Sequence, residues 1–230
     1  MWIAWIALSI LLAACTLLFQ LAVYTPQLPL SLTTGQSAEI TVWRPWSYPA
    51  KFALQFTRTT DQARPELGEW VTPAVPAEGP AVPSLVFSKP GDPIKILVEV
   101  AGQQTPMSAL PATSSDKNSS PVERPLTPWS DSSNPGEFTW PPSKQNVVTQ
   151  AAGKSLYRFT VQEVGPHLQG EQVQLLVVPP LNFKSAQPGY DWLWPLFFWP
   201  TFATLLAVLG AILLWLSWRQ LKTQRTTLNT

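Results

Sequence analysis

The stretch that decides the fold runs from Phe202 to Trp218 and reads FATLLAVLGAILLWLSW. Its only polar side chains are those of Thr204 and Ser217. At about 1.5 Å per residue, a helix that begins near Leu196 is long enough to cross a hydrocarbon layer of roughly 30 Å. We therefore expect a transmembrane helix within residues 192–218. Its first part, Trp192 to Pro200, is rich in tryptophan and phenylalanine, and we interpret it as a collar in the headgroup layer, where aromatic rings settle.

The flanks of this segment predict its orientation. Arg219, Lys222 and Arg225 follow it with no acidic residue among them, and a basic flank stays in the cytoplasm. Residues 219–230 are then a cytoplasmic tail. A second apolar segment, residues 1–24, is also long enough to span. We expect two spans in a bacterial inner membrane, both termini in the cytoplasm and the central region in the periplasm.

Cys15 leaves the fate of the first segment open. Leu12 to Cys15 fits the pattern at which bacterial lipoproteins are cleaved and the cysteine is acylated. However, no Lys or Arg precedes the apolar stretch, as a signal peptide requires, and the stretch stays apolar through Val23. The alternatives are an uncleaved helix, a lipoprotein with lipid on Cys15, and cleavage elsewhere.

Small residues in the second span predict close packing against another helix. Ala203, Ala207 and Ala211 recur every four residues, with Gly210 beside them, and small side chains let helix backbones approach. The alternative is that small residues are simply common in membrane helices.

Composition excludes several classes of protein. The net charge is +1 and only 13% of the 230 residues are charged, so we expect no nucleic acid partner. Twenty-five prolines disfavour a helical soluble domain. The single cysteine allows no intramolecular disulfide.

The region between the spans has the two-residue period of β-strands. Apolar and polar side chains alternate in segments near residues 28–32, 38–42, 52–56, 84–87, 94–100, 156–164 and 172–178. About seven short strands with proline and glycine between them predict an all-β antiparallel sandwich, Ig-like or jelly-roll-like, over residues 26–190. From about 103 to 153 the period lapses, and we expect a Pro/Ser-rich insertion there.

Aromatic residues in loops are the candidate partner-binding residues. Trp46 and Tyr48 lie in a turn between two expected strands, where they either cap the core or sit at an exposed contact. Trp129 and Trp140 lie in the expected insertion, which is either a surface loop or a partner-binding loop. Tryptophan and tyrosine are enriched at the centres of protein interfaces.

The motifs that carry chemistry are missing from the sequence. One histidine and one cysteine leave no cluster for zinc, and no nucleophile or phosphate-binding motif occurs. His167 lies in a tight turn, where a solvated side chain is expected. We expect no enzyme, no catalytic residues, no metal and no cofactor.

Two parts of the chain carry a resemblance to a known family. The strands and aromatic turn of residues 29–58, and the segments 156–161 and 168–177, resemble a bacterial family of small extracytoplasmic β-sandwich proteins. That family has no assigned function; many members look like lipoproteins, and some occur beside type VI secretion toxins. The resemblance implies the sandwich fold and no particular site residue. The C-terminal span and the Pro/Ser-rich stretch depart from the family.

These observations lead to two functional hypotheses. The first is an immunity protein, a membrane-anchored periplasmic domain that binds and neutralises a toxin or effector. The second is an accessory or scaffold subunit of a larger envelope complex. Both are noncatalytic binding roles with membrane lipid and a protein as partners.

Overall fold

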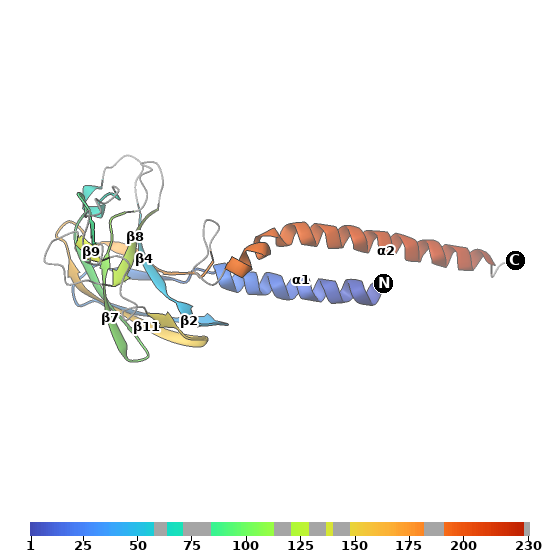
Figure 1. Ribbon diagram of the computed structural model, residues 1–230, viewed down its shortest axis with the longest axis horizontal. Helices are drawn as coiled ribbons and strands as arrows, with labels where there is room; N and C mark the ends of the chain where they lie inside the picture. Colours follow the sequence, from blue (N-terminus) through green and yellow to red (C-terminus); the bar gives the residue numbers. More distant parts are fainter. Residues whose placement is uncertain are drawn as a thin grey trace. The chain divides into compact units, whose positions relative to one another are not determined.

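The computed structural model describes residues 1–57, 64–70, 84–112, 121–128, 137–139, 148–181 and 191–227. The chain forms two compact units (Figure 1). Residues Thr25–Pro179 make a β unit, and Met1–Tyr24 together with Pro180–Thr230 make a helical unit.

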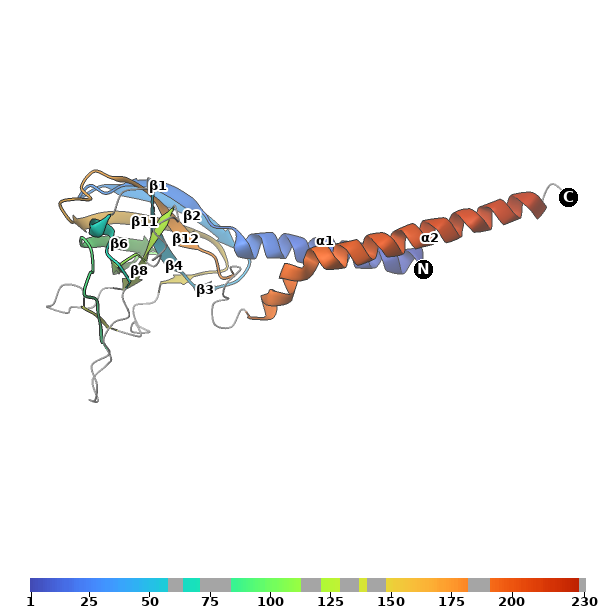
Figure 2. The ribbon, with the colours of Figure 1, turned by 90° about the horizontal axis from the view of Figure 1, so that it is seen from above.

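The helical unit consists of α1 (Trp2–Val23), the 3-10 helix η3 (Asp191–Phe198) and α2 (Trp199–Thr227). Two of its stretches, Trp2–Val23 and Trp194–Gln220, are long and apolar enough to cross a membrane. The helices α1 and α2 run side by side in opposite directions, so both chain termini lie at the same end of the pair (Figures 1 and 2). The aromatic collar forms η3, which contains Pro195 and leads directly into α2.

The main sheet of the β unit has eight strands, and every pairing in it is antiparallel. The strand order is β1 (Gln27–Ser31), β12 (Gln172–Val178), β4 (Lys51–Phe56), β8 (Val122–Pro128), β7 (Gln103–Ala109), β6 (Ile94–Val100), β11 (Gly153–Val164) and β2 (Ser37–Arg44). Two short antiparallel pairs join β3 (Tyr48–Pro49) to β10 (Thr149–Gln150) and β5 (Ser84–Val86) to β9 (Glu137–Thr139), and η1 (Pro65–Leu67) is a single 3-10 turn.

This sheet curls until it is nearly a barrel (Figure 2). Its two edge strands, β1 and β2, follow one another in the chain, and the turn between them is held from both sides. Gly170 N–H donates to Leu32 O at 2.8 Å, while Gly35 N–H donates to Val161 O at 2.8 Å. The expected antiparallel β domain is thus confirmed, whereas an Ig-like or jelly-roll arrangement of two sheets is not, because a single sheet wraps around the core.

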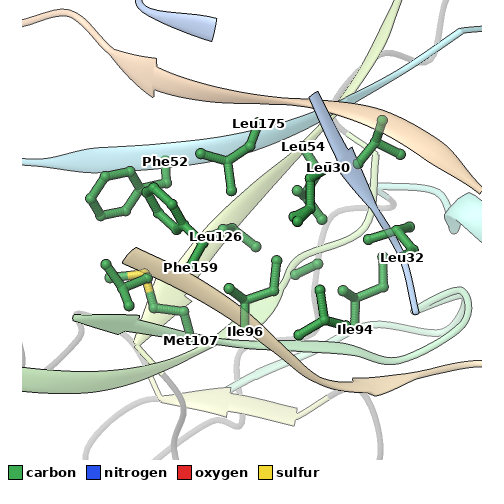
Figure 3. Close-up of a cluster of buried hydrophobic side chains, with 14 of the residues drawn as sticks. Leu30, Leu32, Phe52, Leu54, Ile94, Ile96, Met107, Leu126, Phe159 and Leu175 are labelled. Carbon is green, nitrogen blue, oxygen red and sulfur yellow. The ribbon is translucent and has the colours of Figure 1, made fainter. Parts of the chain in front are cut away.

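The core fills the inside of the curled sheet (Figure 3). Alternate side chains of the strands point inward, as the two-residue period predicts. The ring of Phe52 on β4 packs edge-on against Tyr157 and Phe159 of β11, with centroids 5.4 and 5.3 Å away. Such aromatic pairs stabilise a core beyond the apolar area that they bury.

The stretch expected to be an insertion contains two central strands of this sheet. The prediction that the β pattern lapses from residue 103 was wrong for β7 and β8. Pro106 and Pro125 obscured the alternation, because proline is normally kept out of central strands. Pro106 lies outside the part of β7 that pairs with β8, and the N–H that Pro125 lacks is replaced by a side chain.

That side chain belongs to Arg124, which is buried at 1% exposure. Leu110 N–H donates to Pro125 O at 2.8 Å. In an antiparallel pair, a residue other than proline at position 125 would donate its own N–H to Leu110 O. Instead, Arg124 Nε donates to Leu110 O at 2.8 Å. The arginine therefore satisfies a carbonyl that the proline leaves open.

The same guanidinium joins several loops at this end of the sheet. Its Nη1 atom donates to Asp92 O at 2.8 Å and Glu66 O at 3.5 Å. Its Nη2 atom donates to Ala109 O at 3.2 Å and Pro90 O at 3.3 Å. Burial lowers the pKa of Arg124 to about 10, which leaves the side chain charged at neutral pH.

Candidate interaction surfaces

The aromatic turn after β2 caps the core at Tyr48. The Tyr48 side chain is 1% exposed, so of the two alternatives for this residue the core position is correct and the exposed contact is wrong. Trp46 is half-buried in the same turn. Trp129 and Trp140 lie outside the described residues.

A buried polar cluster surrounds Tyr48 at this end of the β unit. The Arg44 guanidinium lies 5.8 Å from the centre of the Tyr48 ring, and Tyr157 Oη donates to Gln150 Oε1 at 2.6 Å. Gln150 Nε2 in turn donates to Ser155 Oγ at 2.9 Å. Burial raises the pKa of Tyr48 and of Tyr157, while the charge of Arg44 opposes this shift. Closed off from solvent, this cluster positions the ends of strands and presents no binding surface.

The outer face of β2 and β11 carries two large exposed apolar side chains. Trp43 is 47% exposed and Leu156 is 51% exposed. Trp43 lies opposite Lys154, and Leu156 lies opposite Thr41, so the two apolar side chains are diagonal neighbours on one face of the sheet. We call this pair the Trp43–Leu156 patch.

Charged side chains border the patch. Arg158 Nε lies 2.7 Å from Glu39 Oε1 on β2, and Arg158 Nη1 lies 3.8 Å from Glu99 Oε2 on β6. The hydrogen bond and the charge of Glu39 raise the pKa of Arg158. An apolar centre with a charged border is the arrangement that protein interfaces use.

In the helical unit, Gly210 lies against α1, as the small-residue interpretation predicts. A Cβ atom at Gly210 would lie 2.9 Å from the Trp5 ring. Because glycine leaves this room, Trp5 Nε1 reaches the backbone and donates to Leu206 O at 2.9 Å. Near the chain ends, Trp2 Nε1 donates to Ser217 Oγ at 3.0 Å. Gly210 thus packs within the chain itself.

The alanines of α2 divide between two positions. Ala203 and Ala207 line an open groove of about 550 Å³ between the helices, together with Ser9 and Ala13 of α1. Ala211 is exposed and does not line this groove. The groove therefore gathers small residues of both helices on one side of the pair.

Cys15 lies in the middle of α1 and is partly buried. It lines a second, more apolar groove of about 400 Å³ with Trp199 and Phe202 of α2. Cleavage before Cys15 would remove Trp2 and Trp5, and with them both hydrogen bonds to α2 described above. The three alternatives for this segment stay predictions.

His167 is exposed and contacts one acid. Its Nδ1 atom lies 3.2 Å from Asp92 Oδ2, and its backbone N–H donates to the same oxygen at 3.0 Å. Within the described ranges, no three His, Cys, Asp or Glu side chains gather in a group that could hold a metal ion. The Asp92–His167 pair closes a turn beside Gly165, where a Cβ atom would lie 2.5 Å from the Asp92 side chain.

Sequence reasoning missed the residues that now stand out most. Leu156 lies in one expected strand and Trp43 directly follows another, but neither was selected, because the partner across the sheet cannot be read from one strand. Arg124 was not selected because the prolines near it argued against a strand, although Val122, Arg124 and Leu126 have the two-residue spacing of side chains that point inward. All three of these side chains are buried.

The sequence matches no protein-family model and no curated protein. The chain is similar to the crystal structure of a protein from Sulfurospirillum deleyianum, at 14% sequence identity and a TM-score of 0.39. The similarity covers 69% of this chain and 99% of the other.

Proposed function

We propose that this chain is a membrane-anchored, noncatalytic binding protein whose β unit contacts a protein partner in the periplasm. The observation that carries the proposal is the Trp43–Leu156 patch. Both side chains expose about half of their surface, and exposed apolar side chains that adjoin one another within a polar border are a feature of protein–protein interaction sites. Two helices long enough to span a membrane supply the anchor, and the basic flank of α2 favours the periplasmic side for the β unit.

The proposal is tested by photo-cross-linking in the native host. A photoreactive phenylalanine analogue replaces Leu156 in the full chain, and the adduct is identified by mass spectrometry. We expect one stoichiometric adduct, which the substitution Trp43→Ala reduces at least tenfold. Removing a tryptophan from the centre of an interface costs about 2 kcal/mol or more, which corresponds to that factor.

Lys51→Ala is the matched control, since Lys51 is exposed on β4 and lies away from the patch. It should leave the adduct unchanged. If Trp43→Ala and Lys51→Ala behave alike while both proteins stay folded, the patch is not a binding surface.

The immunity role is the first specific form of this proposal. In that form the partner is a toxin or effector that acts in the periplasm, and the gene for this chain lies directly after the toxin gene. Deletion should then poison cells only when the toxin is exported. Trp43→Ala should cause the same poisoning at normal protein levels, and Lys51→Ala should not.

The second form is an accessory subunit of an envelope complex, and the groove between α1 and α2 favours it. Small residues such as Ser9, Ala13, Ala203 and Ala207 allow another transmembrane helix to approach closely. Purification in mild detergent should then recover membrane partners in fixed stoichiometry. Ala207→Leu should remove them, while Ala211→Leu, outside the groove, should not.

A further inference from the structure

Within the part of the chain that the structure describes, β2 pairs on one side only, so half of its backbone hydrogen-bonding groups face away from the sheet. Val161 N–H donates to Gln36 O at 2.9 Å, and hydrogen-bonded pairs recur at every second residue of an antiparallel ladder. Ala38, Ile40 and Val42 therefore direct their N–H and C=O groups toward β11. Ser37, Glu39, Thr41 and Trp43 direct theirs away from the sheet, and all four residues are exposed.

The other edge of the sheet is protected. Val177 N–H donates to Pro26 O at 3.0 Å, and the same alternation makes Gln27, Pro29 and Ser31 of β1 the residues that face away from β12. Pro29 has no N–H to offer, and Ser31 O already accepts a bond from Thr33 N–H at 2.8 Å. Proline on an edge strand is a common protection against pairing with another chain.

β2 carries two charged residues, Glu39 at its edge and the buried Arg44 at its end, but it lacks the proline that protects β1. Its eight residues, SAEITVWR, include no proline and no lysine, and the register shift in the ladder beside it lies between β11 and β6. A long, regular edge of this kind is a template for one more strand.

The inner side of the same edge is incompletely covered. Ala38 and Ile40 of β2 and Leu28 of β1 pack on the core but remain only partly buried. Residues that oppose each other on neighbouring strands point to the same side of a sheet. A strand added beside β2 would therefore place alternate side chains over Ala38 and Ile40.

The charge on the outer side of β2 favours an added strand that carries a basic residue. Among the described residues, Glu39 and Glu99 both pair with Arg158, and Lys154 lies four residues farther along β11, opposite Trp43. The described part of the face around Glu39 therefore carries one excess negative charge. A residue directly opposite Glu39 on an added strand lies within reach of that carboxylate. Lysine or arginine complements it there.

We infer that β2 accepts an extended, amphipathic and cationic segment of a partner protein as a ninth strand. The segment runs antiparallel to β2, places apolar residues over Ala38 and Ile40, and sets a basic residue opposite Glu39. Main-chain hydrogen bonds provide affinity and the alternating side chains provide specificity. This inference rests on the proposed binding role, because it names the way in which the partner of that surface binds.

A synthetic peptide tests the inference on the full chain in detergent micelles. The fluorescently labelled peptide Leu-Val-Thr-Val-Lys-Val-Thr is written so that its lysine falls opposite Glu39 and its central valine opposite Ile40. Saturable binding is expected by fluorescence anisotropy. Hydrogen exchange should slow at the amides of Glu39 and Thr41, which face the added strand.

Two N-methylated peptides test the hydrogen-bond register. Methylation of the lysine nitrogen removes an N–H that faces β2 and should weaken binding at least about tenfold, since steric exclusion adds to the lost bond. Methylation of the central valine nitrogen alters an N–H on the opposite edge and should change binding less than about threefold. Equal effects of the two methyl groups would overturn the inference.

Charge reversal tests the selection at Glu39. Glu39→Lys should weaken the lysine peptide and restore binding of a peptide with glutamate in the same place. Glu123→Lys is the matched control, because Glu123 is exposed on β8, a strand paired on both sides. If both variants bind the lysine peptide as the unchanged protein does, β2 does not select a cationic strand and the inference fails.

The remaining outcomes separate this inference from the proposed function. A dimer of the full chain that Glu39→Lys dissociates would mean that a second copy covers β2, which contradicts a partner strand. A protein cross-linked at Leu156 that binds without slowing exchange at Glu39 and Thr41 would support the proposed function and refute strand addition. Loss of the Leu156 adduct alone, with the peptide still bound in register, would refute only the proposed surface.

Discussion

Replacing Arg124 with methionine should strongly destabilise the β unit. Methionine keeps an apolar chain of similar length but removes every donor, so the five carbonyl oxygens at 2.8–3.5 Å lose the guanidinium. The side chain is 1% exposed, and water has little access to replace it. Hydrogen bonds from charged groups contribute about 1.5–3 kcal/mol each, and the two shortest bonds alone account for about 3–6 kcal/mol.

Relief of the buried charge offsets part of this loss. Burial is the cause that lowers the pKa of Arg124 to about 10, so the charged form is costly to hold inside the fold. The carbonyls remain after the substitution, however, and each buried polar group left without a partner costs about 1–3 kcal/mol. With several carbonyls affected, we expect the free energy of unfolding to fall by about 3–5 kcal/mol.

Pulse proteolysis of the full chain in detergent, across a urea series, measures this change. Arg158→Met is the matched control, because the Arg158 side chain is 50% exposed and its ion pairs lie on the surface. Exposed ion pairs contribute about 0–1 kcal/mol. If Arg124→Met loses no more stability than Arg158→Met, the guanidinium does not hold the loops together and the reasoning is refuted.

Three further predictions follow from the structure. Gly91→Ala should lower the melting temperature of the β unit far more than Gly35→Ala. Both glycines have positive φ, but only at Gly91 would a Cβ atom lie 2.4 Å from another backbone atom, Gly68 N. Equal losses would mean that the positive φ, and not the close contact, sets the cost of adding a Cβ atom. Gly210→Leu should destabilise the helix pair in thermal unfolding in detergent, because it displaces Trp5 from Leu206 O, whereas the exposed Ala211→Leu should not. Similar unfolding curves for the two variants would mean that the contact of Trp5 with α2 does not stabilise the pair. Burial raises the pKa of Tyr157 above its ordinary value of 10.0, so above about pH 10 the unfolded state releases a proton that the folded state keeps, and stability falls as the pH rises. The urea midpoint, measured from pH 9 to 11 in about one-unit steps, should fall less steeply with pH in Tyr157→Phe than in the unchanged protein. An unchanged slope would contradict this assignment.

Local patterns were sufficient for part of the architecture. The spans were predictable because an apolar run of sufficient length is a property of consecutive residues. The strands at 94–100 and 172–178 were predictable in the same way, since alternation appears within the strand itself and the structure has both with the same bounds. Gly210 was identified for a similar reason, as a small residue on a helix face.

The candidate site was less accessible to sequence reasoning. Tyr48 was a candidate partner-binding residue for which the sequence left a core position and an exposed position open. It lies inside, while Trp43, five residues earlier, lies outside. Both are aromatic residues near the same turn, and composition does not separate them. What separates them is the pleat of β2 and the register Trp43↔Lys154.

The sequence by itself determined which segments become membrane-length helices and, outside β7 and β8, most of the strands of the main sheet, because both depend on the spacing of apolar side chains along the chain. Only the tertiary structure decided the strand order, the single curled sheet, and the pairing of β7 and β8 across their prolines. It also decided that Arg124 turns inward and that, of the described strands, only β11 pairs with β2. These outcomes depend on hydrogen bonds and contacts between residues far apart in the chain, such as Arg124 with Glu66, and no local pattern encodes which distant partner a strand will meet.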